Sequence, residues 1–143
     1  MNLLNQLYQI QATLFQLFLK TWGFHWNVIG GDFYQVHALL GEQYTFMFDE
    51  IDTIAEHIRT FEAKALGSLE IITQKSIIED ATMTENPTDM LDKLKDDQLQ
   101  FVQLVKQTHR LADEEGRPAT TALLEQVLLD HDKMIWKLRS MLK

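Results

Sequence analysis

Two histidines and two acidic residues between Phe24 and Glu56 have the residue types and the spacing of a metal-binding site. His25 closes one helical pattern, His37 lies early in the next, and Asp52 follows in that pattern with Glu56 four residues later. Residues four apart project from one face of a helix, so the two carboxylates can bind one hard or borderline cation together. Imidazole nitrogen adds affinity for iron or zinc.

These residues cannot bind one metal ion within a single chain. His37 precedes Asp52 by fifteen residues, and at 1.5 Å per residue that is roughly 22 Å along one helix. Their angular offset is only about 60°, so both face the same side. If two subunits pack these helices antiparallel about a two-fold axis, His37 of one lies beside Asp52 and Glu56 of the other. The spacing predicts a site completed by dimerisation, which His25 joins if the glycine turn after it folds back.

A di-iron site inside one subunit is disfavoured by the same residues. Bundles of that kind supply Glu-x-x-His from two helices, because residues three apart share a face. None of the five histidines has an acidic residue three positions before it. Any one of these residues taken alone is more often hydrogen-bonded or solvated than metal-bound, so the hypothesis rests on the spacing of the whole set.

Long helical patterns surround these residues. Apolar residues recur every three or four positions over 2–27, 33–64, 86–115 and 118–142, and the apolar segment 65–85 suits a short helix lying across a neighbour. Asp32 is a candidate N-cap for the second pattern, and Pro87 is suited to the first turn of the third. Four long helices with a crossover between the second and third predict an all-α, ferritin-like four-helix bundle. We expect one domain over 1–143, with no internal boundary.

Composition narrows the class of protein further. The chain has 143 residues, is 45% hydrophobic, contains no cysteine and carries a formal charge of -8. Without cysteine there is no disulfide or thiolate site, and the negative charge argues against tracking a phosphate backbone. The N-terminal segment lacks a charged leader and a cleavage site, and no apolar run reaches the roughly eighteen residues of a membrane span. A cytoplasmic protein without membrane association is expected.

The central stretch closely resembles the Dps miniferritins, the family of DNA-binding proteins from starved cells. The matching residues are His25-Trp26-Asn27-Val28, Gly30, Phe33, His37, Glu42, Tyr44, and Asp52 through Ala55-Glu56. The resemblance is weak over 66–79 and returns in 111–116 and near the C-terminus. It implies hollow shells of twelve subunits, built from two-fold dimers, that bind Fe(II), oxidise it preferentially with hydrogen peroxide and store ferric mineral.

The resemblance also implies roles for particular residues. His25 and His37 of one subunit and Asp52 and Glu56 of its partner would be the iron ligands of a ferroxidase centre. Trp26 would lie beside this centre as an acceptor of stray oxidising equivalents. Zn²⁺ would be a competing occupant, because its ligand preferences overlap those of iron.

Several positions depart from the family pattern. Gly41 stands where the family commonly has an acidic residue, which predicts a weaker second iron position. Arg117 to Ala122 replace a segment in which relatives carry aspartates lining a pore, so iron enters past other acids or enters slowly. His57 stands where arginine is frequent and is expected at the surface or an interface. Core-edge or surface positions are expected for His109 and His131.

Two alternative functions compete with iron storage. One is DNA compaction with secondary ferroxidase activity, but the first basic residue is Lys20, inside a helix, and twelve copies at -8 carry about -96. No DNA binding is therefore expected near neutral pH. The other is a structural bundle with weakened chemistry, which Gly41 and Ala122 favour. The complete set of two histidines and two carboxylates opposes it, since packing does not require four polar ligands at those spacings.

Overall fold

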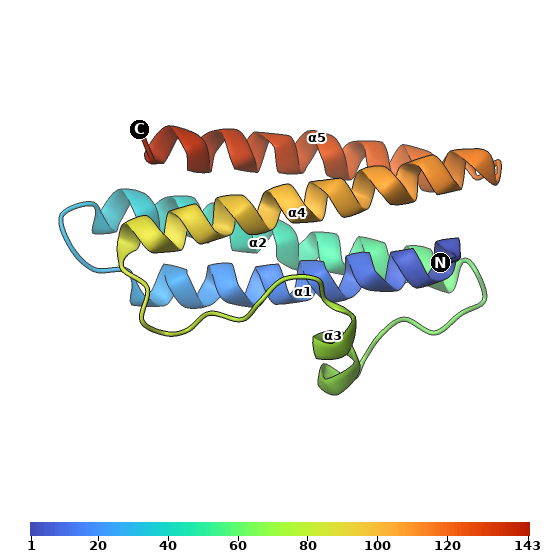
Figure 1. The fold of residues 1–143 in the computed structure, drawn as a ribbon, viewed down its shortest axis with the longest axis horizontal. Helices are drawn as coiled ribbons and strands as arrows, with labels where there is room; N and C mark the ends of the chain where they lie inside the picture. Colours follow the sequence, from blue (N-terminus) through green and yellow to red (C-terminus); the bar gives the residue numbers. More distant parts are fainter.

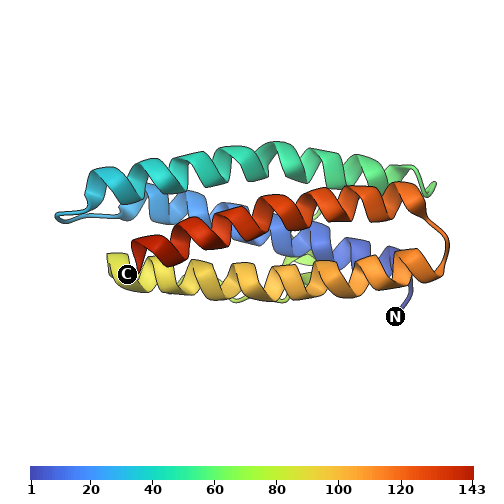
Figure 2. The same ribbon diagram turned by 90° about the horizontal axis from the view of Figure 1, so that it is seen from above.

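The computed structural model describes residues 1–143 and consists of five α-helices, without a β-strand (Figure 1). The helices are α1 (Leu3–Asn27), α2 (Phe33–Arg59), α3 (Leu69–Lys75), α4 (Pro87–Glu114) and α5 (Pro118–Met141). α1 packs on α2 and α4 packs on α5 as antiparallel pairs, and α1 also packs on α4 (Figures 1 and 2). The predicted four-helix bundle with a short helix in the crossover is confirmed.

The helix starts follow local capping chemistry, with one exception. The side chain of Asn2 accepts a hydrogen bond from Asn5 N at 2.8 Å, and Asn86 caps α4 in the same way. Asp32 takes the N-cap position of α2, but its side chain makes no capping hydrogen bond, so that prediction is wrong in its chemistry. The turn depends instead on Gly30, whose φ of 112° favours glycine and whose carbonyl accepts from Phe33 N.

α2 ends at Arg59, not near Lys64 as its helix-forming sequence suggested. Glu62 has a φ of 58°, in the left-handed region, and this conformation stops the helix. The chain then turns back along α1, where Tyr8 Oη donates to the Lys64 carbonyl at 2.7 Å. A contact with a helix more than fifty residues away therefore overrides local helix propensity.

Polar side chains of α1 hold the crossover by its backbone. Gln11 both donates to the Leu66 carbonyl and accepts from the Leu66 N–H, each at 2.9 Å. Lys20 donates to the Glu79 carbonyl at 2.9 Å and forms a buried ion pair with Asp97 of α4 at 2.7 Å. Burial raises the pKa of the Asp97 carboxyl, and the Lys20 ammonium opposes that rise. These contacts join α1, α4 and the crossover.

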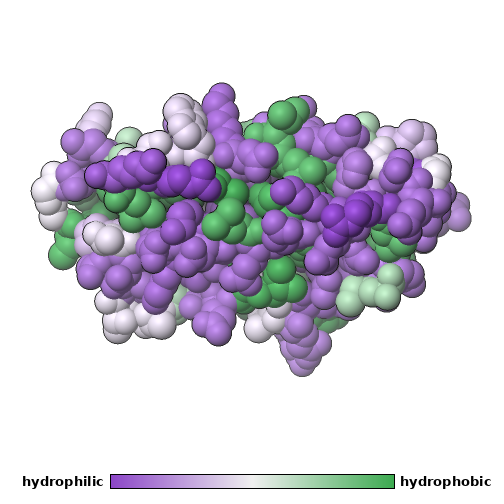
Figure 3. Space-filling view, turned by 45° about the horizontal axis from the view of Figure 1, so that its top comes forward, coloured by the Kyte–Doolittle hydropathy of each residue, from purple (hydrophilic) through white to green (hydrophobic).

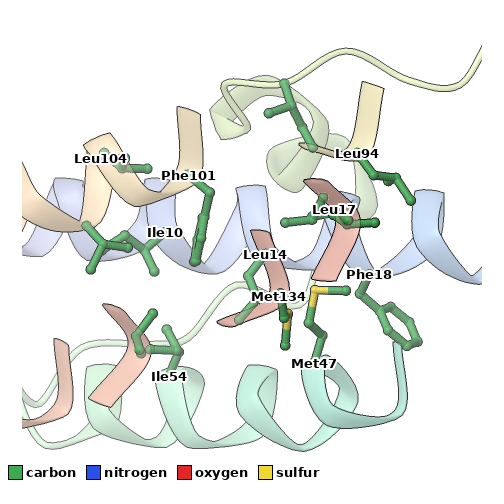
Figure 4. Packing of buried hydrophobic residues seen from close by; sticks show 14 of the residues in the cluster. Ile10, Leu14, Leu17, Phe18, Met47, Ile54, Leu94, Phe101, Leu104 and Met134 are labelled. Carbon is green, nitrogen blue, oxygen red and sulfur yellow. The ribbon is translucent and has the colours of Figure 1, made fainter. Parts of the chain in front are cut away.

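The core lies between the four long helices. Figure 4 shows Ile10, Leu14 and Leu17 of α1 facing Met47 of α2 and Phe101 of α4, and all five side chains are fully buried. Burying each such side chain contributes about 1.5–3 kcal/mol. This packing fixes the rotation of α1 and α2 about their axes, and so decides which residues face outward.

A buried polar cluster crosses this core. His131 of α5 is fully buried, which corrects its expected position at the core edge or surface. Its Nδ1 lies 2.5 Å from Gln98 Oε1 of α4, and its Nε2 lies 2.7 Å from Glu50 Oε1 of α2. Gln98 Nε2 is then directed to Met134 Sδ at 3.6 Å. The polar atoms of three helices thus satisfy one another, as burial requires.

The molecular surface is mainly hydrophilic, with apolar side chains gathered in separate patches on the face shown in Figure 3. No helix is long and apolar enough to cross a membrane. On α2, the exposed apolar residues include Tyr34 and Phe48, which are 78% and 64% exposed. They stand on the same side of the helix as His37 and Asp52, because the spacings approximate whole turns.

Glu85 organises the end of the crossover and provides a testable pH dependence. Its carboxylate accepts from Thr82 N at 2.8 Å, from Thr84 N at 3.2 Å and from Lys93 Nζ at 3.1 Å. Burial alone would raise the pKa of Glu85, but the backbone N–H donors and Lys93 outweigh it and lower the pKa from 4.5 to about 2.

Glu85→Gln is expected to lower the free energy of unfolding near pH 7 by about 1.5–3 kcal/mol, the usual range for hydrogen bonds to a charged group. Because the folded pKa is depressed, this contribution is complete above pH 4.5 and disappears as the pH falls through about 2. Urea unfolding of both proteins between pH 7 and pH 2 should show the gap closing. Glu70→Gln, in exposed α3, is the control; a gap independent of pH would contradict the prediction.

Candidate metal centre

His25 and His37 come together at one end of the α1/α2 pair. His25 lies in the last turn of α1, and His37 lies in the second turn of α2. Val28 and Val36 are both buried at this end, so the turn between them folds α2 tightly back on α1. The two imidazole rings stack with their centroids 3.8 Å apart and 12° between their planes. The structure therefore supplies the approach of His25 that the sequence permitted but did not require.

The two histidines bind each other's backbone. His25 Nδ1 lies 2.6 Å from the His37 carbonyl oxygen, and His37 Nδ1 lies 2.7 Å from the His25 carbonyl oxygen. A carbonyl can only accept, so both Nδ1 atoms must carry the proton. Each neutral ring then has its lone pair on Nε2, and neither Nε2 makes a hydrogen bond in the chain. This is how a backbone acceptor fixes the tautomer of a metal-binding histidine.

Aromatic rings surround the histidine pair. Phe33 stacks on His37 at 4.8 Å, and the Tyr44 ring lies 5.1 Å from the His25 ring. The Trp26 ring packs against Trp22 at 4.5 Å and is 55% exposed. The sequence pattern assigned no role to Tyr44. Its spacing of seven residues from His37, two helical turns, is the signal that could have placed both on one face.

Asp52 and Glu56 lie further along α2 and are both exposed. Neither carboxylate forms an ion pair or a side-chain hydrogen bond within the chain. Within one chain, no three His, Asp or Glu side chains are close enough together to hold a metal ion. The structure thus brings His25 to His37 but leaves the two carboxylates apart from them.

His57 lies beside Glu56 in sequence but turns toward α5. Its Nε2 lies 2.8 Å from Thr120 Oγ1, and its ring meets Phe61 edge-on at 5.6 Å. Burial, and then the nearby charge of Arg117, lower the pKa of His57. The Arg117 guanidinium itself lies 4.4 Å over the Phe61 ring. His57 is thus half-buried between α2 and α5 within the subunit, so the surface position is only partly right, and an interface position stays a prediction.

Gly41 lies against the ring of His25. A Cβ at this position would stand 2.9 Å from His25 Cε1 and 3.2 Å from His25 Nδ1. Carbon atoms essentially never approach that closely without a shift. The His25 ring therefore occupies the space that a side chain at position 41 would need.

An antiparallel four-helix bundle with one long crossover is the ferritin-like class of fold, and the comparisons agree. The ferritin-like domain model matches residues 4–143. The antigen TpF1 of Treponema pallidum is 33% identical, over 96% of this chain and 78% of that protein. The Dps structure from Bacillus brevis superposes with a TM-score of 0.95 at 28% identity, over 99% of this chain and 95% of that one.

A third comparison is with a relative whose chemistry is described. A Dps protein from Vibrio cholerae, described as a member of a broad superfamily of ferritin-like diiron-carboxylate proteins, superposes with a TM-score of 0.94. It is 28% identical over 99% of this chain and 89% of that chain. The chain belongs to the Dps family of ferritin-like miniferritins.

Proposed function

We propose that this chain is the subunit of a miniferritin that binds Fe(II) at centres shared by two subunits, oxidises it and stores the ferric product. The observation that carries the proposal is the pair of reciprocal hydrogen bonds between His25 and His37. They direct both Nδ1 protons inward and leave two imidazole lone pairs for a metal. Membership of the Dps family and the diiron-carboxylate description of the Vibrio cholerae relative support the same chemistry.

The proposed ligands are His25 and His37 of one subunit with Asp52 and Glu56 of its two-fold partner. Two neutral imidazoles and two carboxylates balance the charge of one divalent ion. Nitrogen and oxygen donors in this mixture suit Fe(II). They also suit Zn²⁺, which is expected to compete for the site.

The outward face of α2 supports the shared arrangement. Phe48 is 64% exposed and lies between His37 and Asp52 along the helix. Two α2 helices packed antiparallel would cover this apolar side chain on both copies and bring each histidine pair to the other copy's carboxylates. Because a two-fold contact is self-complementary, two equivalent centres arise per dimer. We propose that six such dimers form a hollow shell of twelve subunits.

The proposed reaction consumes Fe(II) and hydrogen peroxide, the two reactants that together generate hydroxyl radicals. Two Fe(II) ions each give one electron to hydrogen peroxide, which takes up two protons and becomes two water molecules. The residues of this chain bind and hold the iron, while the iron supplies the redox chemistry. The carboxylates stabilise the more highly charged Fe(III) better than they stabilise Fe(II). Removing ferrous iron and peroxide together would protect the cytoplasm from oxidative damage, without a need for DNA binding.

The proposal predicts rapid oxidation of Fe(II) by the assembled protein. After anaerobic loading with Fe(II), added hydrogen peroxide is expected to give ferric absorbance at least about tenfold faster than dissolved oxygen does. The ferric product should co-elute with protein on gel filtration. His109→Gln is a suitable control, because its partner Glu125 lies 3.4 Å away on α5, outside the proposed centre. Oxidation no faster than in protein-free buffer would rule the function out.

A further inference from the structure

We propose that Gly41 is a positioning residue of the metal centre, because its missing side chain lets His25 bind the His37 carbonyl. The inference concerns the geometry of the histidine pair without metal, and it rests on the proposed function only for its effect on metal affinity. It adds a role for Gly41 to the prediction that the glycine removes an acidic ligand.

The geometry of an α-helix explains why position 41 matters. The carbonyl of residue i points toward the N–H of residue i+4, so the His37 carbonyl points along α2 toward Gly41. A side chain that donates to the same oxygen from outside the helix must therefore lie beside residue 41. His25 Nδ1 does so, 2.6 Å from the oxygen. The contacts of a Cβ with His25, 2.9 Å to Cε1 and 3.2 Å to Nδ1, are the consequence.

The opposite hydrogen bond needs no glycine. The His25 carbonyl lies in the last turn of α1, where helix carbonyls have no intrahelical partner. The residue four positions later is Ile29, which lies beyond the end of the helix and is 76% exposed. His37 Nδ1 therefore reaches its oxygen without passing a side chain of α1. The His37 carbonyl lies inside α2, whereas the His25 carbonyl lies at the end of α1. Only the hydrogen bond to the His37 carbonyl therefore requires a glycine four residues later.

The His25 ring is held between neighbours, so it cannot move away from a Cβ at position 41 and keep its present contacts. One face stacks on His37 at 3.8 Å, and Tyr44 lies 5.1 Å away. The helices cannot separate easily, because Leu40 next to Gly41 is fully buried and Phe24 next to His25 is 3% exposed. A Cβ would therefore turn the ring away from the His37 carbonyl. That turn releases the fixed tautomer and the direction of Nε2.

The cost of the glycine supports a positioning role. Glycine inside a helix is about 1 kcal/mol less favourable than alanine. Gly41 has no left-handed backbone angle that would require glycine. Its conformation is ordinary, so the close approach of His25 is the local reason for its presence.

The experiment compares Gly41→Ala with Gly23→Ala in the full-length assembled protein. Gly23 lies in α1 two residues before His25, and a Cβ there would have no heavy atom within 4 Å. Both substitutions gain helix propensity, so Gly23→Ala controls for that gain. In metal-free protein labelled with ¹⁵N-histidine, the protected Nδ1–H signal of His25 should persist in Gly23→Ala and disappear in Gly41→Ala, while the Nδ1–H signal of His37 should persist in both. The signals of fully buried His131 serve as an internal reference.

The metal affinity is measured with Co²⁺ as the probe. Gly41→Ala is expected to weaken Co²⁺ binding roughly 10- to 100-fold, the usual effect of losing a partner that orients a ligand. In a His25→Ala background the same substitution should have no further effect, because the ring it displaces is absent. Equal effects in both backgrounds, or Gly41→Ala with unchanged imidazole signals and affinity, would overturn the proposal. If instead His25→Ala binds Co²⁺ as tightly as the parent, the shared centre fails while the imidazole signals still decide the role of Gly41.

Discussion

Mixed assemblies of His37→Ala and Asp52→Ala subunits are expected to recover Fe(II) oxidation that neither variant has alone. Each single variant removes one proposed ligand from every centre, so each should oxidise iron at least about 100-fold more slowly than the parent protein. In a dimer of one His37→Ala and one Asp52→Ala subunit, one centre carries both defects and the other carries none. Random mixing makes half of the dimers heterodimers, so about one quarter of all centres are intact.

The measurement is the initial rate of ferric absorbance for co-expressed subunits, each purified by a separate tag to confirm mixing. His25→Ala mixed with His37→Ala is the matched control. These two defects lie in the same half of the centre, so every heterodimer has two damaged centres and no activity should return. Recovery in both mixtures, or in neither, would show that the ligands are not divided between subunits as proposed.

Removing His131 is expected to have the largest effect on stability. His131→Ala leaves Glu50 and Gln98 buried without the ring that bridges them, and breaking a buried pair of this kind costs about 3–5 kcal/mol. The Phe101 ring, whose centroid is 4.6 Å from that of His131, also loses a neighbour. Urea unfolding at one fixed protein concentration is the measurement, since assembly makes the midpoint depend on concentration.

Two comparisons separate the buried pair from a general loss of side-chain volume. His109→Ala removes a histidine whose side chain is 30% exposed, so it should cost less than about 1 kcal/mol. The double variant His131→Leu with Glu50→Leu should recover much of the loss, because apolar residues can replace a buried pair at similar volume. If His131→Ala were no more destabilising than His109→Ala, the cluster would not contribute as described.

The arrangement of long helices could be predicted because their signals are local. Asn86 and Pro87 define the start of α4 by themselves, and periodic apolar residues define the face of each helix that packs inward. The end of α2 could not be predicted, because residues after Arg59 favour helix, while Tyr8 and Gln11 of α1 bind the backbone of the crossover. Tertiary contacts decided that boundary.

The candidate centre was predictable in part for the same reason. The distance from His37 to Asp52 follows from helix geometry, so residue spacing alone excludes a metal shared by both within one chain. The stacking of His25 on His37 depends on how tightly the turn closes, which no residue type specifies. The sequence predicts a missing acidic ligand at Gly41, but it could not show that the His25 ring lies against this glycine. Likewise, His131 lies on a core stripe, but its partners come from two other helices.

The reciprocal histidine pair also has a consequence for when, during biosynthesis, the proposed metal centre can form. Each ring is held by a carbonyl of the other helix, so neither is oriented until α1 and α2 have docked. A polypeptide emerging from the ribosome with α1 formed and α2 incomplete has one mobile imidazole and no second one beside it. If the pair binds iron as proposed, newly made subunits are expected to be poor chelators, with iron uptake deferred until the chain has folded.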